Sequence, residues 1–393
     1  MTVKIPFEAA SLTPTGILPM HNKRMYFAVI LFPLSLIYGV IVFFRNLLFD
    51  VGIIKPTGFR LPVISVGNIT VGGTGKTPHV EYIVNLLKDY FSIAVLSRGY
   101  KRKSKGFQLA GSGSSFQETG DEPMQIKTRF PEIIVAVDSN RVHGIQHLIT
   151  QFSHLQTVIL DDAFQHRYVR PGLSIVLVDH NRPVFRDFLL PLGNLRESRF
   201  NINRADIVVV SKCPPEMDEL QRRKFVRRLC LWHQQPVFFT FYRYGNIMPV
   251  FEEKANALVM AKDRQDNTGI LLITGIADNR PLKDYLVQFF KNVVVMTFPD
   301  HHSYTTDDIR AVEKRFGDLP HNAKVIITTE KDAVRFRELP DAGQRIGEYL
   351  YYIPVEVKFL DNAGEIFNET VMNFCRGGAD ILNLQESAGP ERV

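Results

Sequence analysis

Short apolar runs alternate with longer stretches of mixed polarity along the middle of this 393-residue chain. The runs are residues 61–66, 93–96, 133–137, 158–160, 174–178 and 207–210. Strands that are apolar on both faces, separated by segments long enough for helices, are typical of a mostly parallel sheet with helices on both sides. The pattern therefore predicts an α/β fold.

The pattern changes after residue 235. Residues 237–242 and 248–252 are two further runs joined through Gly245-Asn246, which predicts a hairpin. A second α/β series follows at residues 271–274, 293–296, 325–328 and 351–355. We therefore expect a core domain over residues 51–235, a connecting hairpin or linker over 236–268 and a smaller α/β domain over 269–393.

The N-terminal segment, residues 1–50, has a different pattern. Residues 25–44 are 20 positions without a charge, bounded by Lys23-Arg24 and by Arg45. As a helix they would reach about 30 Å, the thickness of a bilayer's hydrocarbon core. A signal peptide is disfavoured because the run is too long and lacks a small-residue cleavage site, whereas a buried core helix remains an alternative. We expect a membrane-associated helix that either spans the bilayer or inserts into one leaflet.

A glycine-rich segment directly follows the first apolar run. It reads Gly67-Asn68-Ile69-Thr70-Val71-Gly72-Gly73-Thr74-Gly75-Lys76-Thr77-Pro78, and an amphipathic stretch follows it. In this context backbone N–H groups at a helix start cradle a polyphosphate, Lys76 adds a charge, and the Thr77 hydroxyl can ligate Mg²⁺. Thr70 replaces the first glycine of the strict pattern, so the loop is a variant. Residues 70–77 predict a nucleoside triphosphate site in a P-loop NTPase-like domain.

A pair of carboxylates supports this prediction. Asp161-Asp162 ends the run 158–160, and the carboxyl ends of parallel strands are where open α/β sheets bind ligands. One of the two side chains would bind Mg²⁺ opposite Thr77. Two adjacent carboxylates also favour a nearby cation because they otherwise repel each other.

Transfer to an alcohol requires a general base in addition to a metal site. Asp121 and Glu122 lie on a Gly-Asp-Glu-Pro turn, and His301 directly follows a strand of the second domain. The histidine would orient a carboxylate across the cleft between the domains or act as the base itself. Taken alone, each of these segments fits a solvated loop at least as well.

Composition narrows the classes of function. The net charge of +6 is modest and no basic stripe carries interleaved aromatic residues, so we expect no nucleic-acid partner. The three cysteines are too far apart in sequence for a disulfide framework or a zinc site, which fits a reducing compartment. A basic run over residues 98–105 would suit anionic lipid or a phosphorylated substrate, and equally an exposed loop. No motif indicates a protein partner.

Several motifs occur in a fixed order along the chain. After the glycine-rich loop they are Ser97-Arg98-Gly99-Tyr100, Gly120-Asp121-Glu122-Pro123, Asp161-Asp162-Ala163-Phe164-Gln165-His166, Leu190-Pro191-Leu192-Gly193-Asn194-Leu195-Arg196-Glu197, Asp300-His301 and Thr329-Glu330-Lys331-Asp332-Ala333. Together they resemble the tetraacyldisaccharide 4'-kinase family, which phosphorylates the precursor of lipid A. The resemblance spans about residues 25–360.

The resemblance implies a kinase that transfers the γ-phosphate of ATP to the 4'-hydroxyl of an acylated disaccharide 1-phosphate. It implies Lys76 as the phosphate-binding lysine, Asp121 as the catalytic base and His301 as its partner. The remaining implied roles are Mg²⁺ binding by Thr77, Asp161, Asp162 and Glu122, and substrate contact by Arg98, Tyr100 and Arg196. The resemblance further implies an enzyme on the cytoplasmic face of the bacterial inner membrane.

The competing hypothesis is a membrane-tethered P-loop ATPase or GTPase that transfers nothing to a lipid. A GTPase requires Asn-Lys-x-Asp after a strand to read the guanine base. Ser211-Lys212-Cys213-Pro214 supplies the lysine but neither of its partners. The residues alone leave an ATPase open.

Overall fold

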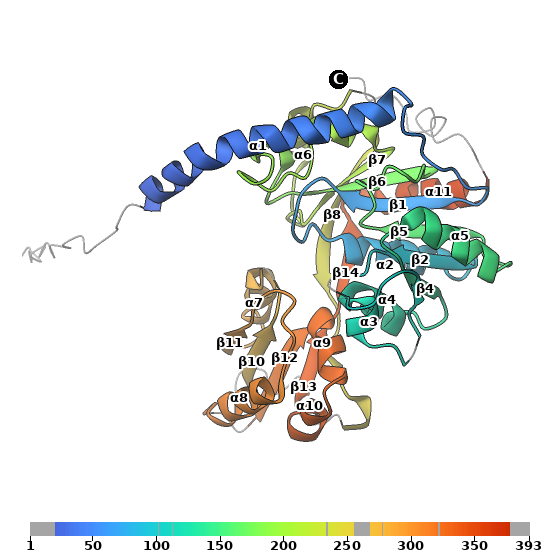
Figure 1. The fold of residues 1–393 in the computed structure, drawn as a ribbon. Helices are drawn as coiled ribbons and strands as arrows, with labels where there is room; N and C mark the ends of the chain where they lie inside the picture. Colours follow the sequence, from blue (N-terminus) through green and yellow to red (C-terminus); the bar gives the residue numbers. More distant parts are fainter. Residues whose placement is uncertain are drawn as a thin grey trace, which may run out of the picture.

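The computed structural model contains two β-sheets and a long N-terminal helix that lies along the larger sheet's lobe and projects beyond it (Figure 1). It describes residues 20–377, apart from 101, 112, 233–234, 255–267, 277 and 321–322. The predicted α/β class is confirmed, with the larger sheet in the N-terminal lobe and the smaller one in the second lobe.

The larger sheet has nine strands in the order β14-β8-β7-β6-β1-β5-β2-β4-β3. Their bounds are β1 Val63–Asn68, β2 Ile93–Ser97, β3 Gln108–Leu109, β4 Ile134–Val137, β5 Thr157–Asp161, β6 Leu173–Asp179, β7 Ile207–Ser211, β8 Val237–Tyr244 and β14 Val355–Phe359. Neighbouring strands from β8 to β4 run parallel, and only the edge strands β14 and β3 are antiparallel. Every residue of β1, β2, β5, β6 and β7 is buried, as expected for strands covered on both faces.

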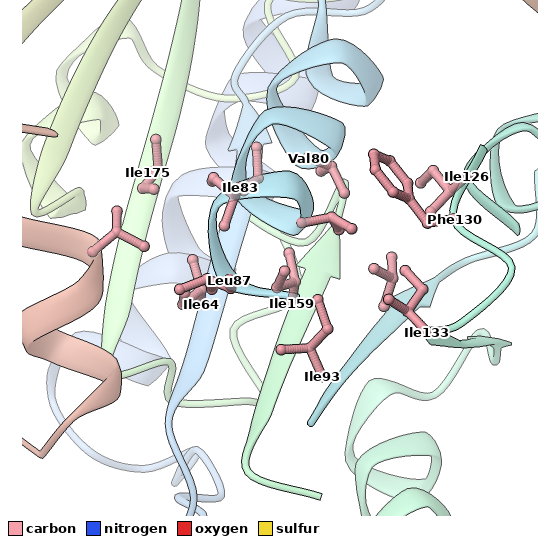
Figure 2. Packing of buried hydrophobic residues seen from close by; sticks show 14 of the residues in the cluster. Ile64, Val80, Ile83, Leu87, Ile93, Ile126, Phe130, Ile133, Ile159 and Ile175 are labelled. Carbon is pink, nitrogen blue, oxygen red and sulfur yellow. The ribbon is translucent and has the colours of Figure 1, made fainter. Parts of the chain in front are cut away.

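Helices cover both faces of this sheet. The helices are α2 Lys76–Leu87, α4 Asp121–Arg129 and α11 Gly364–Cys375 on one face, and α5 Arg141–Gln151 and α6 Glu219–Leu229 on the other. Figure 2 shows Ile83 and Leu87 of α2 packed near Ile64 of β1. Val63, the neighbour of Ile64, belongs to the core on the opposite face because successive strand residues point to opposite sides. This packing aligns the strands so that their carboxyl ends form one polar edge.

The smaller sheet has the strand order β11-β10-β12-β13-β9, with β9 antiparallel to the parallel rest. Its elements are β9 Met248–Pro249, β10 Thr268–Thr274, α7 Arg280–Leu286, β11 Asn292–Thr297, α8 Thr306–Gly317, β12 Ala323–Thr329, α9 Glu330–Arg337, α10 Pro340–Arg345 and β13 Leu350–Ile353. Val334 of α9 is buried in the core of the larger sheet's lobe. Helix α9 therefore joins the two lobes.

The hairpin predicted from residues 237–242 and 248–252 is wrong. β8 pairs with β7 and β14, whereas β9 pairs with β13 in the smaller sheet. The chain crosses between the sheets at Gly245, and it crosses back at Pro354, which divides the predicted strand 351–355 into β13 and β14. The Gly245 N–H donates to the Pro354 carbonyl at 2.9 Å, so the two crossings lie side by side.

These crossings return the end of the described chain to the larger sheet. β14 and α11, which the sequence assigns to the second domain, pack in the N-terminal lobe. An alternating pattern shows that a strand exists but not which sheet it joins, because pairing depends on residues far away in sequence. Residues 255–267 of the predicted linker and 378–393 of the predicted C-terminal domain lie outside the described residues.

The N-terminal helix α1 (Met20–Asp50) has its polarity inverted relative to a helix of a soluble core. Within it, Val29–Asp50 is long and apolar enough to cross a membrane, and only 11% of its 18-residue apolar segment is buried. Apolar side chains such as Ile37 and Ile41 are exposed, whereas Ser35 and Asn46 are buried against the protein. A helix that turns its polar groups inward and its apolar groups outward is suited to lipid contact.

Candidate active site

The glycine-rich loop between β1 and α2 has the backbone that a phosphate site requires. Gly75, directly before α2, has φ +87° and ψ 27°, a left-handed conformation that favours glycine. A Cβ at Gly75 would lie 1.7 Å from Tyr242 Oη of β8. Asn68 Nδ2 donates to Thr74 Oγ1 at 2.7 Å and ties the two ends of the loop together. The loop leads into the N-terminus of α2, where backbone N–H groups stabilise anions.

Neighbouring segments hold the outer part of this loop. Thr70 forms an antiparallel bridge with Leu195, so this position is extended and does not need the glycine of the strict pattern. Lys212, which follows β7, donates to the Gly73 carbonyl and pairs with Asp179 at 2.9 Å. The loop is therefore shaped by protein contacts before any ligand is present.

Asp161 and Asp162 are adjacent in sequence but have different surroundings. Asp162 pairs with Arg196 Nη1 at 3.0 Å and with Lys76 Nζ at 3.4 Å. Burial would raise the pKa of Asp162, but the charges of Lys76 and Arg196 outweigh burial and lower it. The carboxylate of Asp161 accepts one hydrogen bond, at Oδ2 from Ser97 Oγ at 3.0 Å, and its Oδ1 is buried without a partner. Burial and the charge of Asp162 raise the pKa of Asp161 to about 6.

This asymmetry indicates where a cation fits. The buried Oδ1 atom of Asp161 has no hydrogen-bond partner, whereas Lys76 and Arg196 already pair with the carboxylate of Asp162. Over residues 29–377, within the ranges described above, no three acidic, histidine or cysteine side chains form a ready-made metal cage. Mg²⁺ does not require such a cage because it keeps several waters and binds substrate phosphates.

A second cluster of charges spans the two lobes. Asp121 begins α4 in the larger lobe, and His301 follows β11 in the smaller one. His301 Nδ1 lies 2.7 Å from Asp121 Oδ2, although the residues are 180 positions apart. His301 has φ +61°, a left-handed conformation that is uncommon for a non-glycine residue. The predicted acid–histidine contact across the lobes is therefore present in the geometry.

Helix α9 supplies the other groups around this pair. Arg335 donates through Nε to Asp121 Oδ1 at 3.0 Å and through Nη2 to Asp121 Oδ2. Lys331 Nζ lies 3.1 Å from His301 Nε2, so His301 Nε2 accepts and His301 Nδ1 donates to Asp121. Burial alone would raise the pKa of Asp121, but the hydrogen bonds from His301 and Arg335 and the charge of Arg335 lower it well below its usual range.

Glu122 connects the two clusters. Its Oε1 lies 3.7 Å from Lys331 Nζ and 3.9 Å from His301 Nε2. Its charge also contributes to the raised pKa of Asp161, after burial, Asp162 and the opposing effect of Lys76. The phosphate loop, the acidic pair and the histidine contact therefore belong to one continuous electrostatic environment.

The three residues expected to contact the substrate have different surroundings. The Tyr100 ring packs edge-on against His301 with centroids 5.4 Å apart, and the Arg98 side chain is exposed nearby in sequence. Arg196 instead binds Asp162 and Gln165 Oε1, so its guanidinium braces the acidic pair. Lys101 of the basic run lies outside the described residues.

Comparison with known proteins identifies the family. The profile of the family described as tetraacyldisaccharide-1-P 4'-kinase matches residues 27–373. The chain belongs to this family. It is 46% identical to the tetraacyldisaccharide 4'-kinase of Phocaeicola vulgatus over 358 residues, which cover 90% of this chain and 97% of that protein. It is 44% identical to the enzyme of Bacteroides thetaiotaomicron over 353 residues, or 88% of this chain and 93% of that one.

A solved structure supports the same assignment. The chain resembles the "apo" form of LpxK from Aquifex aeolicus in complex with ATP, with a TM-score of 0.67 and 29% identity. The match covers 88% of this chain and 99% of that one. The predicted resemblance and function are confirmed: the chain is an ATP-dependent 4'-kinase of lipid A biosynthesis, not a switch that transfers nothing. The family also implies a membrane-associated enzyme, in agreement with α1.

Sequence reasoning missed the contribution of α9 to this 4'-kinase site. The sequence predicts no physical role for the Glu330-Lys331-Asp332 motif, and Arg335 lies outside every motif that it offers. A signal was available, because Asp332 and Arg335 are three residues apart and so share one helix face. What the pattern could not show is that this face meets Asp121, 214 residues away from Arg335.

Proposed function

We propose that ATP binds with its phosphates on residues 70–77 and that the Asp121–His301 pair accepts the proton of the 4'-hydroxyl as it attacks the γ-phosphate. The supporting observation is the 2.7 Å contact of His301 with Asp121, which brings a proton-accepting pair from both lobes to the edge that carries the phosphate loop. Lys76 would offset the charge of the transferring group, so that catalysis consists mainly of positioning and electrostatics.

The roles at the metal follow from the asymmetry of the acidic pair. Asp161 would hold Mg²⁺ with the hydroxyl of Thr77, and Glu122 would share in this coordination directly or through water. Asp162 holds Lys76 and Arg196 in place and would contribute negative charge near the same ion. When bound, the ion supplies positive charge that offsets the charge of the β- and γ-phosphates.

The low basicity of Asp121 fits the reaction type. Its carboxylate is ionised at any physiological pH because Arg335 and His301 stabilise the charged form. Phosphoryl transfer passes through a loose transition state with little bonding to the attacking oxygen, so the hydroxyl proton becomes acidic only late. A fixed carboxylate–imidazole pair that orients the hydroxyl is therefore sufficient.

The acceptor is an acylated disaccharide 1-phosphate whose chains stay in the bilayer, at the cytoplasmic face of the inner membrane where ATP is present. Tyr38 Oη of α1 donates to the Arg196 carbonyl at 2.6 Å, so the lipid-facing helix directly contacts the segment that braces Asp162. A sugar presented at the membrane surface would reach the site next to α1. Arg98, which is exposed near Tyr100, would contact the 1-phosphate.

The proposal is tested by following label from γ-labelled ATP into a purified disaccharide-1-phosphate lipid, with wild type and Asp121→Asn. We expect Asp121→Asn to lower kcat by about 10²–10⁴-fold, the usual contribution of a general base. ATP affinity, measured by equilibrium binding, should change by less than about threefold because the carboxylate makes no contact with the phosphate loop. Equal losses of turnover and of ATP affinity would instead assign Asp121 to nucleotide binding.

A further inference from the structure

Arg335 is a deeply buried charged group in direct contact with the proposed catalytic pair. Its side chain is 1% exposed, and it lies between two carboxylates, Asp121 from the other lobe and Asp332 from its own helix. It makes two hydrogen bonds to Asp121 and one, at 3.0 Å, to Asp332 Oδ1. A fork of parallel N–H donors fixes both the position and the plane of a carboxylate.

Asp332, the second carboxylate that Arg335 contacts, is held in place by residues of the smaller lobe. Asp332 is fully buried, and its Oδ2 accepts the Gly275 N–H at 2.9 Å and the Thr329 hydroxyl at 2.8 Å. Asp332 therefore fixes Arg335 on α9, and Arg335 in turn fixes Asp121 on α4. A buried ion pair of this kind contributes little net stability but defines one geometry, since each removed partner leaves a charge uncompensated.

We propose that Arg335 is a positioning residue of the kinase reaction, which holds the Asp121 carboxylate in plane toward His301 and does so only while α9 is docked on the larger lobe. This inference rests on the proposed role of Asp121. It gives a role to the Thr329-Glu330-Lys331-Asp332 motif, whose aspartate orients Arg335 and whose lysine faces His301 Nε2.

A purely structural strap between the lobes is the alternative, and the chain contains a matched control for it. Arg129 of α4 bridges Glu81 of its own lobe, at 2.7 Å, and Glu330 of α9, at 3.3 Å. It crosses the same interface at the same two helices without touching Asp121. Substituting Arg129 removes an ion pair between the lobes and leaves the carboxylate–histidine contact in place.

The experiment compares Arg335→Gln, Arg335→Lys, Arg129→Gln and Asp121→Asn in the full-length enzyme, with kcat, the KM for ATP and the melting temperature as readouts. We expect Arg335→Gln to lower kcat by about a hundredfold, the scale for losing one preorganised donor, with the KM for ATP within about threefold.

The comparison is defined by the groups that remain. His301 still contacts Asp121 in the Arg335 variants and Lys331 still contacts His301, so only the guanidinium is lost. Arg335→Lys keeps the charge with a single donor group, and its kcat should fall between those of wild type and Arg335→Gln. It carries the test if Arg335→Gln does not fold. Arg129→Gln removes an ion pair between the lobes without touching Asp121, so its kcat should stay within about threefold of wild type.

The outcomes separate this inference from the proposed function. Losses of kcat in Arg335→Gln and Arg335→Lys that equal the loss in Arg129→Gln, or that come with an equal rise in the KM for ATP, would overturn the positioning role. Full turnover of Asp121→Asn would instead overturn the proposed function. A kcat loss that is confined to the two Arg335 variants and is smaller in Arg335→Lys, with an impaired Asp121→Asn, supports both.

Discussion

The phosphate loop and the Asp121–His301 contact are two halves of one site that are built in opposite ways. The loop is contiguous in sequence, lies between β1 and α2, and owes its form to two glycines with positive φ, Gly72 and Gly75, and to strands on either side. The acid–histidine contact joins residues 180 positions apart and exists only where the two lobes meet. A site assembled this way would hold ATP in the larger lobe and complete the Asp121–His301 pair when the smaller lobe docks.

The halves also differ in how their charges are compensated. Near the loop, Asp161 retains a carboxylate oxygen without a partner, which leaves room for a cation. At the lobe interface, both oxygens of Asp121 are bound and Arg335 is enclosed between carboxylates. The half near the loop therefore has a carboxylate oxygen that a ligand cation would pair with. In the other half, groups of the protein itself already pair with both oxygens of Asp121.

The largest expected effect concerns the backbone of the loop. Gly75→Ala forces a left-handed alanine, which costs about 1–2 kcal/mol, and places its Cβ against Tyr242 Oη. We expect ATP affinity, measured by calorimetry, to fall by about a hundredfold or more. Tyr242→Phe in the same chain should recover part of this loss because it removes the closest atom.

Gly73→Ala is the matched control for Gly75→Ala. Gly73 does not have a left-handed backbone, and a Cβ at this position meets nothing within 4 Å. Without nucleotide, Gly73→Ala should keep the free energy of unfolding within about 0.5 kcal/mol of wild type, as for an ordinary surface change. Equal destabilisation by both substitutions would show that the loop is not held in the conformation described here.

The next effect is the pH dependence of the stability that Asp161 contributes. Its folded pKa of about 6 lies above the ordinary 3.8, so the folded state binds more protons than the unfolded state between these values. Without Mg²⁺, the contribution of Asp161 to the free energy of unfolding should therefore fall by up to about 3 kcal/mol as the pH rises from 4 to 6. Asp161→Asn should abolish this fall, as measured by urea unfolding in EDTA.

Mg²⁺ provides the complementary measurement for Asp161. A cation competes with the proton on the same carboxylate, so the apparent Mg²⁺ affinity of the wild type should rise between pH 5 and 7. Asp161→Asn should bind Mg²⁺ weakly and without this rise, whereas Asp121→Asn should retain it. Retention of the pH dependence in Asp161→Asn would place the ion elsewhere in the site.

The same contrast explains what the sequence could predict. The loop, the apolar strands and α1 each depend on neighbouring residues, so their patterns were sufficient to predict them. The partner of β8 and the sheet of residues 355–359 were not predictable, because Gly245-Asn246 suggests a turn whatever strand comes next. Arg335 was missed for a related reason: its helix face is visible in the sequence, but the docking of α9 on α4 depends on tertiary packing.

The smallest expected effect on the chemistry concerns α1, which contacts the loop half through Tyr38 but turns its apolar side chains outward. Ile37→Asp places a charge at an exposed position near the middle of the apolar stretch, where a charged residue costs about 2.5–3.5 kcal/mol in lipid. We expect vesicle binding in a flotation assay to weaken by about a hundredfold, with turnover on detergent-dispersed acceptor within about twofold.

Val51→Asp, equally exposed but beyond the last turn of α1, is the control and should bind within about threefold of wild type. If Ile37→Asp floats like wild type, the outward apolar face of α1 does not contact lipid, and the acceptor must reach the site by another route.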